Sequence, residues 1–332
     1  MCSFFGVELS KLAYAADCVW TSQTLDPDAG DCTGGVCTCG NLTIAGGQAV
    51  TVPSTVTSIV ITGDADISGT LSANGQGNTS DLGDGAGSNG GERSWSAGGG
   101  GGGGYGGSGG NGGEGKDGTW CQENYGIGGS TYGSNTNPAF LGSGGGTGGR
   151  SFGLTVAGGT GGGFISLTVG GTITVVGSIT TNGNNGVNGL GSGNGGSGGG
   201  SGGSIYISAS VISGDGTITA RGGNGGSFLG SGYGGAGGGG GGRVAMYYGS
   251  TDSWSAVPSV SGGSHGADTH DCNDTGVNGS VGTTYSLQYS VADQPSVSAP
   301  ADEGTDVAIN PTLTSSAYSS DGASHTTSDW EV

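Results

Sequence analysis

Two histidines and three aspartates gather in one short polar segment of the chain: His265, Asp268, His270, Asp271 and Asp274. Imidazole nitrogens and carboxylate oxygens can together ligate zinc, and the carboxylates alone can hold calcium. The alternative is a solvated polar loop in which Cys272 forms a disulfide, with Cys121 as one available partner. The spacing therefore predicts a candidate metal site, with the polar loop as the open alternative.

A second acidic segment, Asp26-Pro27-Asp28-Ala29-Gly30-Asp31, has the alternating acids of a calcium loop. It lacks the remaining ligands and the distant glutamate of such a loop. The sequence indicates no organic cofactor, and calcium is the cofactor that these acidic segments suggest.

Glycine-rich sequence also matches catalytic motifs by chance. Gly191-x-Gly193-x-x-Gly196 fits the dinucleotide fingerprint, but no strand-helix-strand unit surrounds it. Ser108 and Ser197 lie in Gly-x-Ser-x-Gly without the strand-to-helix turn that a nucleophilic serine needs. We therefore predict no catalytic residue and a protein that is not an enzyme.

The chain has seven cysteines. The spacing of Cys32, Cys37 and Cys39 lacks the two Cys-x2-Cys pairs of zinc sites, and no histidine lies near it. Disulfides in an oxidising compartment are the favoured interpretation. The candidate disulfide cysteines are Cys18, Cys32, Cys37, Cys39, Cys121 and Cys272.

The N-terminal end has the form of a processed leader. Ala13-Tyr14-Ala15-Ala16-Asp17 resembles a signal-peptidase site, although the preceding residues lack a basic start. We interpret residues 1–16 as a signal-peptide remnant, with an ordinary N-terminal segment as the alternative. Residues 17–40 are then a cysteine-rich N-terminal cap.

Six aromatic residues lie in or beside the glycine tracts, where their rings could stack on sugars. The alternative for each is burial against the tracts. They are Trp95, Tyr105, Trp120, Tyr125, Phe228 and Tyr233.

Composition excludes several classes of protein. Of 332 residues 87 are glycine, and the net charge is −19 with only six basic residues, which argues against a nucleic-acid partner. No apolar run reaches the ~20 residues of a membrane-spanning helix. Seven prolines and no sustained three-residue glycine period exclude collagen.

Internal repeats indicate the fold class. The strand-like segment after Gly203 recurs after Gly242, and that after Gly177 recurs after Gly216, an offset of 39 residues in both pairs. Apolar residues alternate with small or polar ones in these segments, and helical periodicity is missing. We predict an all-β protein with almost no α-helix, in which residues 41–292 form a parallel β-helix, a glycine-rich β-solenoid.

The glycine tracts carry a local period of three, for example at Gly193, Gly196, Gly199 and Gly202. A polyproline-II-type helix has three residues per turn, so we predict bundles of such helices inserted into the solenoid, with disordered loops as the alternative. Residues 69–250 resemble glycine-rich bundle proteins, including the snow flea antifreeze protein and phage tail-fibre adhesins. They are also similar to glycine-rich bacterial surface proteins, a resemblance that implies polyglycine-II-like packing and an adhesin-like role.

The C-terminal residues 293–332 have a different pattern. A proline-rich linker precedes alternating segments that end near Trp330, and these resemble the start of a fibronectin type III or Ig-like module. We expect an incomplete module here and a longer parent protein.

These observations favour a secreted or cell-surface bacterial protein with a non-catalytic, structural or adhesive function. The expected partners are cell-surface glycans or other surface proteins, with no nucleic acid and no transmembrane segment. The alternatives are an ice-binding protein and a β-helix polysaccharide lyase or hydrolase. The enzyme alternative requires acids clustered on an exposed face, whereas the outward positions are mostly Ser, Thr and Gly.

Overall fold

The computed structural model describes residues 15–92, 96–118, 120–150, 155–189, 193–228, 232–268, 272 and 275–289, and two short strands beyond them. The chain divides into two units, Met1–Leu287 and Gln288–Val332. Every regular element in the described part is a β-strand, so the all-β prediction is confirmed. Within the same residues, no helix is present that could cross a membrane.

The first unit contains many strands of two to four residues, including two antiparallel pairs, and four longer strands. In chain order the strands are β1 (Cys18–Val19), β2 (Gln23–Thr24), β3 (Cys32–Thr33), β4 (Val36–Cys39), β5 (Leu42–Ile44), β6 (Ala49–Thr51), β7 (Ser58–Ile61), β8 (Ala65–Ile67), β9 (Thr70–Ser72), β10 (Gly115–Asp117), β11 (Trp120–Gln122), β12 (Phe164–Val175), β13 (Ser178–Thr180), β14 (Ser204–Ser213), β15 (Thr217–Thr219), β16 (Arg243–Asp252) and β17 (Thr283–Gln288).

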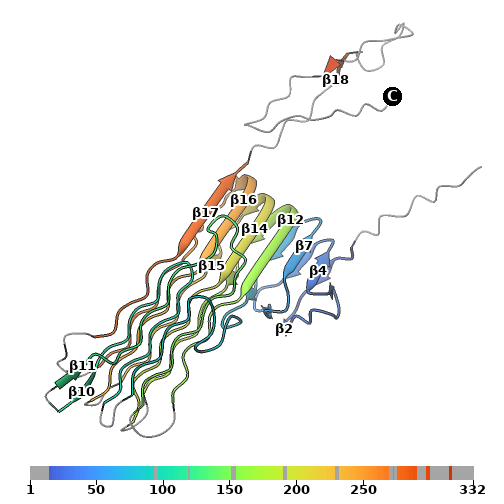
Figure 1. The fold of residues 1–332 in the computed structure, drawn as a ribbon. Coiled ribbons are helices and arrows are strands. Elements are labelled where there is room, and N and C mark those ends of the chain that lie inside the picture. The colour runs from blue at the N-terminus through green and yellow to red at the C-terminus, as the bar shows by residue number, and fades with distance from the viewer. Residues whose placement is uncertain are drawn as a thin grey trace, which may run out of the picture. The chain divides into compact units, whose positions relative to one another are not determined.

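The larger sheet has the order β1-β5-β8-β12-β14-β16-β17, and β7 and β4 continue it on one side of β12 (Figure 1). The long strand β12 pairs in parallel with two short strands, β7 through Leu167 and β8 through Ile173. Its register with β14 shifts between Val169 and Thr172, where Gly170 and Gly171 lie. The strand β12 is thus parallel to its neighbours, whereas β3 and β4 of the same sheet pair antiparallel. Neighbours such as β12 and β14 are separated in the sequence by a strand of the smaller sheet.

The smaller sheet has the order β15-β13-β9-β6-β2, and all of its neighbours are parallel. Its central strands are only three residues long, and each presents one buried apolar side chain, such as Leu71, Ile179 and Ile218. Residues that pair between β13 and β15 are 39 residues apart, as Ser178 and Thr217 are, so the offset between the sequence repeats equals the register of these strands. The same offset joins Ser204 of β14 to Arg243 of β16.

Apolar side chains of both sheets form one core. Ile165, Leu167, Ile205 and Ile207 alternate with outward-facing residues along β12 and β14, and they pack in one cluster with Ile179 of the smaller sheet. Each fully buried side chain of this size contributes about 1.5–3 kcal/mol. Period-two alternation thus produces a thin core along the parallel strands.

Asparagine and aspartate side chains join successive turns of the chain in an arrangement that we call the Asx clamp. The Oδ1 atom of Asn182 accepts the N–H of Arg221 at 2.7 Å, while the N–H of Gly183 donates to the Arg221 carbonyl at 2.8 Å. Two hydrogen bonds therefore hold one residue of the next turn. The same arrangement joins Asp17 to Asn41, Asn41 to Asp64, Asn74 to Asn182, Asn185 to Asn224, Asn188 to Ser227, and Asn224 to Ser264.

The described glycine tracts are extended segments that run on from the long strands and lie side by side (Figure 1). Their hydrogen bonds repeat every third residue. In the tract 99–104, Gly99 and Gly102 donate to the segment 108–113, and Gly100 and Gly103 donate to the segment 194–203. The remaining two donors bond the segment 85–91. One tract is thus tied to three neighbours by main-chain bonds alone.

Close approach explains why glycine occupies these positions. A Cβ atom added to Gly102 would meet the Gly238 carbonyl, and one added to Gly198 would meet the Gly101 carbonyl. Ordering glycine has a large entropy cost, and the pairing of nearly every N–H and C=O in the interior offsets it.

In the second unit, the structure describes β18 (Val297–Ala299) and β19 (Thr314–Ser315), which pair antiparallel. The rest of the predicted sandwich module, including Trp330, and the predicted leader up to Tyr14 lie outside the described residues.

Candidate functional site

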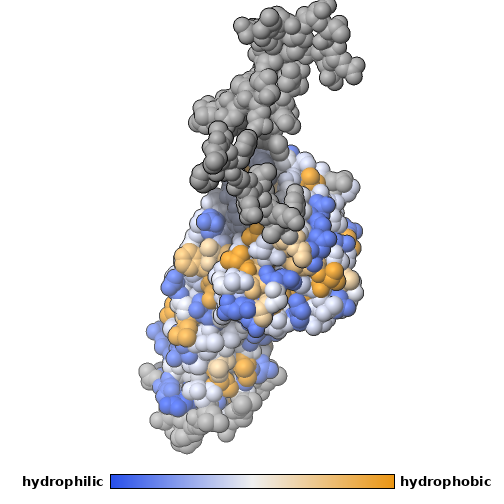
Figure 2. All heavy atoms as spheres, turned by 90° about the vertical axis from the view of Figure 1, so that its right-hand side faces the viewer, coloured by the Kyte–Doolittle hydropathy of each residue, from blue (hydrophilic) through white to orange (hydrophobic). Residues whose placement is uncertain are grey.

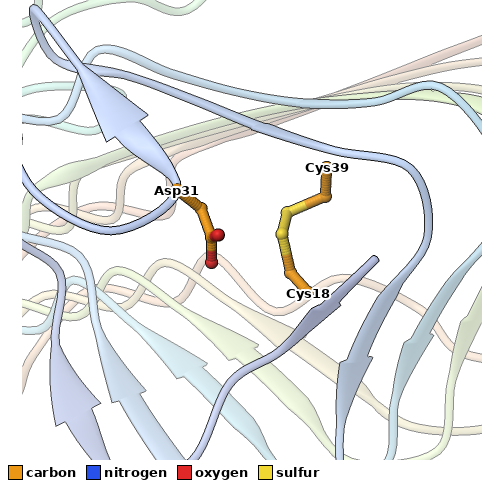
Figure 3. A group of neighbouring side chains, drawn as sticks. All are labelled: Cys18, Asp31 and Cys39. Atoms are coloured by element: carbon orange, nitrogen blue, oxygen red, sulfur yellow. A yellow bond between two sulfur atoms is a disulfide. The ribbon is translucent and has the colours of Figure 1, made fainter. Parts of the chain in front are cut away.

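Three disulfides join the cysteines that the sequence singled out. The pairs are Cys18–Cys39, Cys32–Cys37 and Cys121–Cys272. Asp31 lies beside the first pair, and Figure 3 shows its carboxylate next to the bonded sulfur atoms. Glu114 lies beside the third pair. A disulfide sulfur has no thiolate to offer a metal, so both groups are structural in this state. The Asp31 carboxylate instead accepts the Trp20 indole N–H at 2.9 Å.

The histidine-acid segment is described only in part. The His265 main-chain N–H donates to Asn278 Oδ1 at 2.8 Å, and its ring Nδ1 lies 3.0 Å from the Gly266 carbonyl oxygen. The Asp268 carboxylate lies 3.5 Å from the Gly235 N–H. His270, Asp271 and Asp274 lie outside the described residues, so the metal site stays a prediction.

In the acidic segment 26–31, Asp26 and Asp28 use their carboxylates within the loop, whereas Asp31 accepts the Trp20 indole N–H. Asp26 Oδ1 accepts the N–H of Asp28 at 3.0 Å, and Asp28 Oδ1 accepts the N–H of Gly34 at 2.9 Å. These bonds stabilise the turn before β3 and join it to the turn between β3 and β4.

Burial corrects half of the predicted sugar-stacking aromatics. Tyr105 is 0% exposed, and Phe228 and Tyr233 are each 7% exposed and contact one another edge to face. Their rings fill space among glycine segments, so none of the three offers a face to a ligand. Trp120 is 75% exposed on β11 and Tyr125 is half-buried, whereas Trp95 lies outside the described residues.

A different set of aromatic side chains lies on the outer face of the larger sheet. Tyr206 of β14, Tyr247 of β16 and Tyr285 of β17 come from three neighbouring strands, and we call them the tyrosine row. Their ring centroids are 5.5 Å apart for Tyr206–Tyr247 and 5.6 Å apart for Tyr247–Tyr285. All three side chains are half-buried, so their rings are packed together and partly open to solvent.

The segment 130–141 lies against this face and is fixed there by three side chains of the long strands. The Tyr247 hydroxyl donates to the Thr136 carbonyl at 2.8 Å, and the Ser204 hydroxyl donates to the Phe140 carbonyl at 2.6 Å. The third side chain, Arg243, reaches the Tyr132 carbonyl. The Tyr247 ring is therefore held in position by its own hydroxyl group.

In the described part of the chain, the outward positions around the row are polar and uncharged. Outward positions on β12 and β14 near it are occupied by Ser166, Thr168, Ser208 and Ser210, and the one charged side chain, Arg243, is buried. Desolvation raises the pKa of Tyr247, and the nearby hydroxyls of Tyr285 and Tyr206 add to the increase. The Tyr247 phenol consequently stays neutral through the physiological pH range.

Sequence reasoning noticed Tyr206 only as one polar residue of an outward face. A signal was available, because the 39-residue offset places Tyr206 opposite Ala245, and Tyr247 follows two residues later on the same face. The third member, Tyr285, lies beyond the repeats and could not have been aligned with them.

The smaller sheet carries a second ordered surface. Two rows of hydroxyl side chains cross it in register, and Thr70 Oγ1 lies 3.0 Å from Ser178 Oγ in one of them. In the other, Thr180 donates to Ser72 at 3.1 Å. The rows are Thr70, Ser178, Thr217 and Thr24, Thr51, Ser72, Thr180, Thr219.

Figure 2 shows hydrophobic residues as small separate groups among hydrophilic and weakly polar ones on the face that it presents.

No family model, curated protein or solved structure matches this chain in the comparisons.

Proposed function

We propose that the first unit is a right-handed parallel β-helix whose turns are extended by a polyglycine-II bundle. The parallel register of both sheets, the single core between them and the Asx clamps from turn to turn support the β-helix. Hydrogen bonding with a period of three to several neighbours supports the bundle.

The function that this architecture supports best is that of a non-catalytic structural or adhesive protein, secreted or held at the surface of a bacterial cell. One observation carries this proposal: glycine segments tied to three neighbours by main-chain bonds make a stiff body that needs few side chains. Such a body suits presentation of a binding face at a distance. Three disulfides favour an oxidising location outside the cytosol.

Surface location and adhesion can be tested on intact cells of the source organism. A non-permeating protease and an antibody against the chain should both reach it, and deletion of the gene should lower attachment to surfaces or to other cells. A chain found only in the cytosol with reduced cysteines would contradict the proposal. A surface chain whose deletion leaves attachment unchanged would limit the function to a structural role.

Ice binding is a second candidate, favoured by the hydroxyl rows. In-register strands repeat every ~4.8 Å, and alternate residues along a strand are ~6.6 Å apart, so the rows form a regular two-dimensional grid of oxygen atoms. Thermal hysteresis tests it. Thr51→Tyr should abolish the activity by interrupting the grid, whereas Thr168→Tyr on the other sheet should not. No hysteresis at high protein concentration excludes this function.

A further inference from the structure

A small pocket lies between two segments of the insertion that separates β9 from β12. We propose that it binds an alkylammonium group, carried by a lysine of a partner protein or by a free amine. The proposal goes beyond the adhesive function, because the site would exist in a protein with a purely structural role. The pocket has a volume of about 240 Å³, and its lining combines two aromatic rings with an aliphatic side chain, a glycine, an amide and a carboxylate: Asn78, Gly83, Asp84, Tyr132, Phe140 and Leu141.

The Asp84 carboxylate is the first argument. The residue is exposed, and no hydrogen bond or ion pair among the described residues engages its side chain. Desolvation raises the pKa of Tyr132, and the Asp84 carboxylate adds to the increase, so the two groups lie close together. An unpaired carboxylate at a pocket can accept a charge-assisted hydrogen bond from an ammonium donor.

The main chain on both sides of Asp84 is held in place. Gly83 has a φ of 107°, and a Cβ added there would lie 2.6 Å from Ser143 Oγ, so this position requires glycine. The Gly83 carbonyl accepts the N–H of Ala86 at 3.1 Å, and the N–H of Gly85 donates to Ser143 Oγ at 3.0 Å. Because the neighbours of Asp84 are fixed, little backbone freedom is lost when its carboxylate meets a ligand.

Aromatic rings beside the carboxylate are the second argument. The rings of Tyr132 and Phe140 pack edge to face, with centroids 5.9 Å apart and an interplanar angle of 82°. Phe140 is 48% exposed, and the Tyr132 hydroxyl is fixed by donating to the Leu141 carbonyl at 2.5 Å. Aromatic faces attract cations, and the apolar stem of an amine can pack against rings and aliphatic side chains.

Size and charge narrow the class of ligand. Sites that enclose a whole small molecule usually have volumes of ~300–1,000 Å³. At about 240 Å³, this pocket suits one side chain or a short amine better than an oligosaccharide. The net charge of −19 repels anions and attracts cations. Arg243 is buried, is bonded to the Tyr132 carbonyl and does not line the pocket, so the lining itself carries no cation.

Nuclear magnetic resonance titration of the ¹⁵N-labelled full chain tests the proposal. The probe is n-butylammonium, n-butanol is the neutral control of the same length, and butyrate is the anionic control. We expect saturable shifts at the amides of residues 78–85 and 132–141 with n-butylammonium, and at least tenfold weaker binding of both controls. The acetylated methylamide of lysine and putrescine then distinguish the two sources, because the tighter of them identifies a partner protein or a free amine.

Three variants separate the pocket from the overall charge. Asp84→Asn removes the carboxylate, and Phe140→Leu removes the ring while keeping an apolar side chain. Each should weaken binding of n-butylammonium at least fivefold. Asp117→Asn removes an exposed carboxylate of β10, which does not line the pocket, and should stay within twofold. Amide spectra that match the parent chain outside the pocket show that each variant is folded.

The outcomes also separate this site from the wider function. Equal affinity for n-butanol, unchanged binding in both pocket variants, or shifts confined to other residues overturns the assignment. If the pocket does not bind n-butylammonium but cells without the gene still lose attachment, the adhesive function stands and only this site is wrong.

Discussion

Arg243 donates to the Tyr132 carbonyl oxygen from two of its nitrogens, Nε at 3.1 Å and Nη2 at 2.8 Å, across 111 residues of sequence. Its Nη1 donates to Thr283 at 2.9 Å, and its guanidinium carbon lies 5.4 Å from the centroid of the Tyr105 ring. One buried side chain therefore joins the segment 130–141, the sheet and the bundle. The tyrosine row next to it depends on this junction for its shape.

Removal of this junction should be costly. Arg243→Ala should lower the free energy of unfolding by about 2–3 kcal/mol, because hydrogen bonds from a charged donor are lost and buried acceptors stay unpaired. Arg243→Lys should recover less than half of the loss, since an ammonium cannot reproduce the planar fork. Urea unfolding gives both values. Arg221→Ala, an exposed arginine bonded to Ser259, is the control and should change stability by no more than about 0.5 kcal/mol.

The glycine segments predict a contrast between two alanine substitutions. Gly198→Ala places a methyl group against the Gly101 carbonyl and should destabilise the fold by about 1–3 kcal/mol. At Gly46 the nearest atom to an added Cβ is the Ser68 oxygen at 3.9 Å, so Gly46→Ala should be neutral or slightly stabilising. Calorimetry of both variants measures the difference. Equal melting temperatures for the two would contradict the close packing of the bundle.

The long-range disulfide should matter more than the short one. Cys121 and Cys272 are 151 residues apart, whereas Cys32 and Cys37 are five apart. In the chain-entropy description, the first cross-link contributes about 5 kcal/mol and the second about 2 kcal/mol. Double alanine variants of each pair, compared by urea unfolding, test the order. A smaller effect at Cys121–Cys272 would show that the unfolded chain is already restricted.

Stability should fall in alkaline solution. Desolvation raises the pKa of Tyr132 from 10.0 to about 12, and the nearby Asp84 carboxylate contributes in the same direction. Because the unfolded state ionises first, the stabilisation is complete below pH 10 and is lost as the pH rises towards 12. Unfolding free energies at pH 9 and 11 should differ less in Tyr132→Phe than in the parent chain. Tyr125→Phe controls for loss of a hydroxyl, and phenolate absorbance follows the ionisation.

Much of the fold could be predicted from the sequence, because alternating apolar residues and internal repeats mark its strands. Alternation at Ile165, Leu167 and Val169 identified the buried face of β12, because a strand places every second side chain inward. The repeat offset anticipated the register of Thr217 against Ser178. The register of the first turns was also present in the sequence, since residues 69–75 repeat the pattern of residues 177–183, and Thr70 pairs with Ser178 across 108 residues.

The candidate site was harder to predict from the sequence than the fold. Tyr105 stands between two glycines and is fully buried, whereas Tyr206 stands between two isoleucines and lies on the outer face. What separates them is the set of chain segments that cover each ring, and those segments are distant in the sequence. Tyr105 lies within 4.8 Å of the Tyr132 ring and bonds Ser204, which no local pattern specifies.

The Asx clamps have a consequence for the chemical ageing of the protein. An Asn-Gly bond normally deamidates quickly, because the glycine nitrogen attacks the asparagine amide carbon to form a succinimide. In the clamp at Asn182-Gly183 that nitrogen is committed to the Arg221 carbonyl, and the amide is held by the Arg221 N–H. The attacking geometry is unreachable without opening the turn. Folding therefore slows deamidation at the five Asn-Gly pairs held in this way, which begin at Asn74, Asn182, Asn185, Asn188 and Asn224.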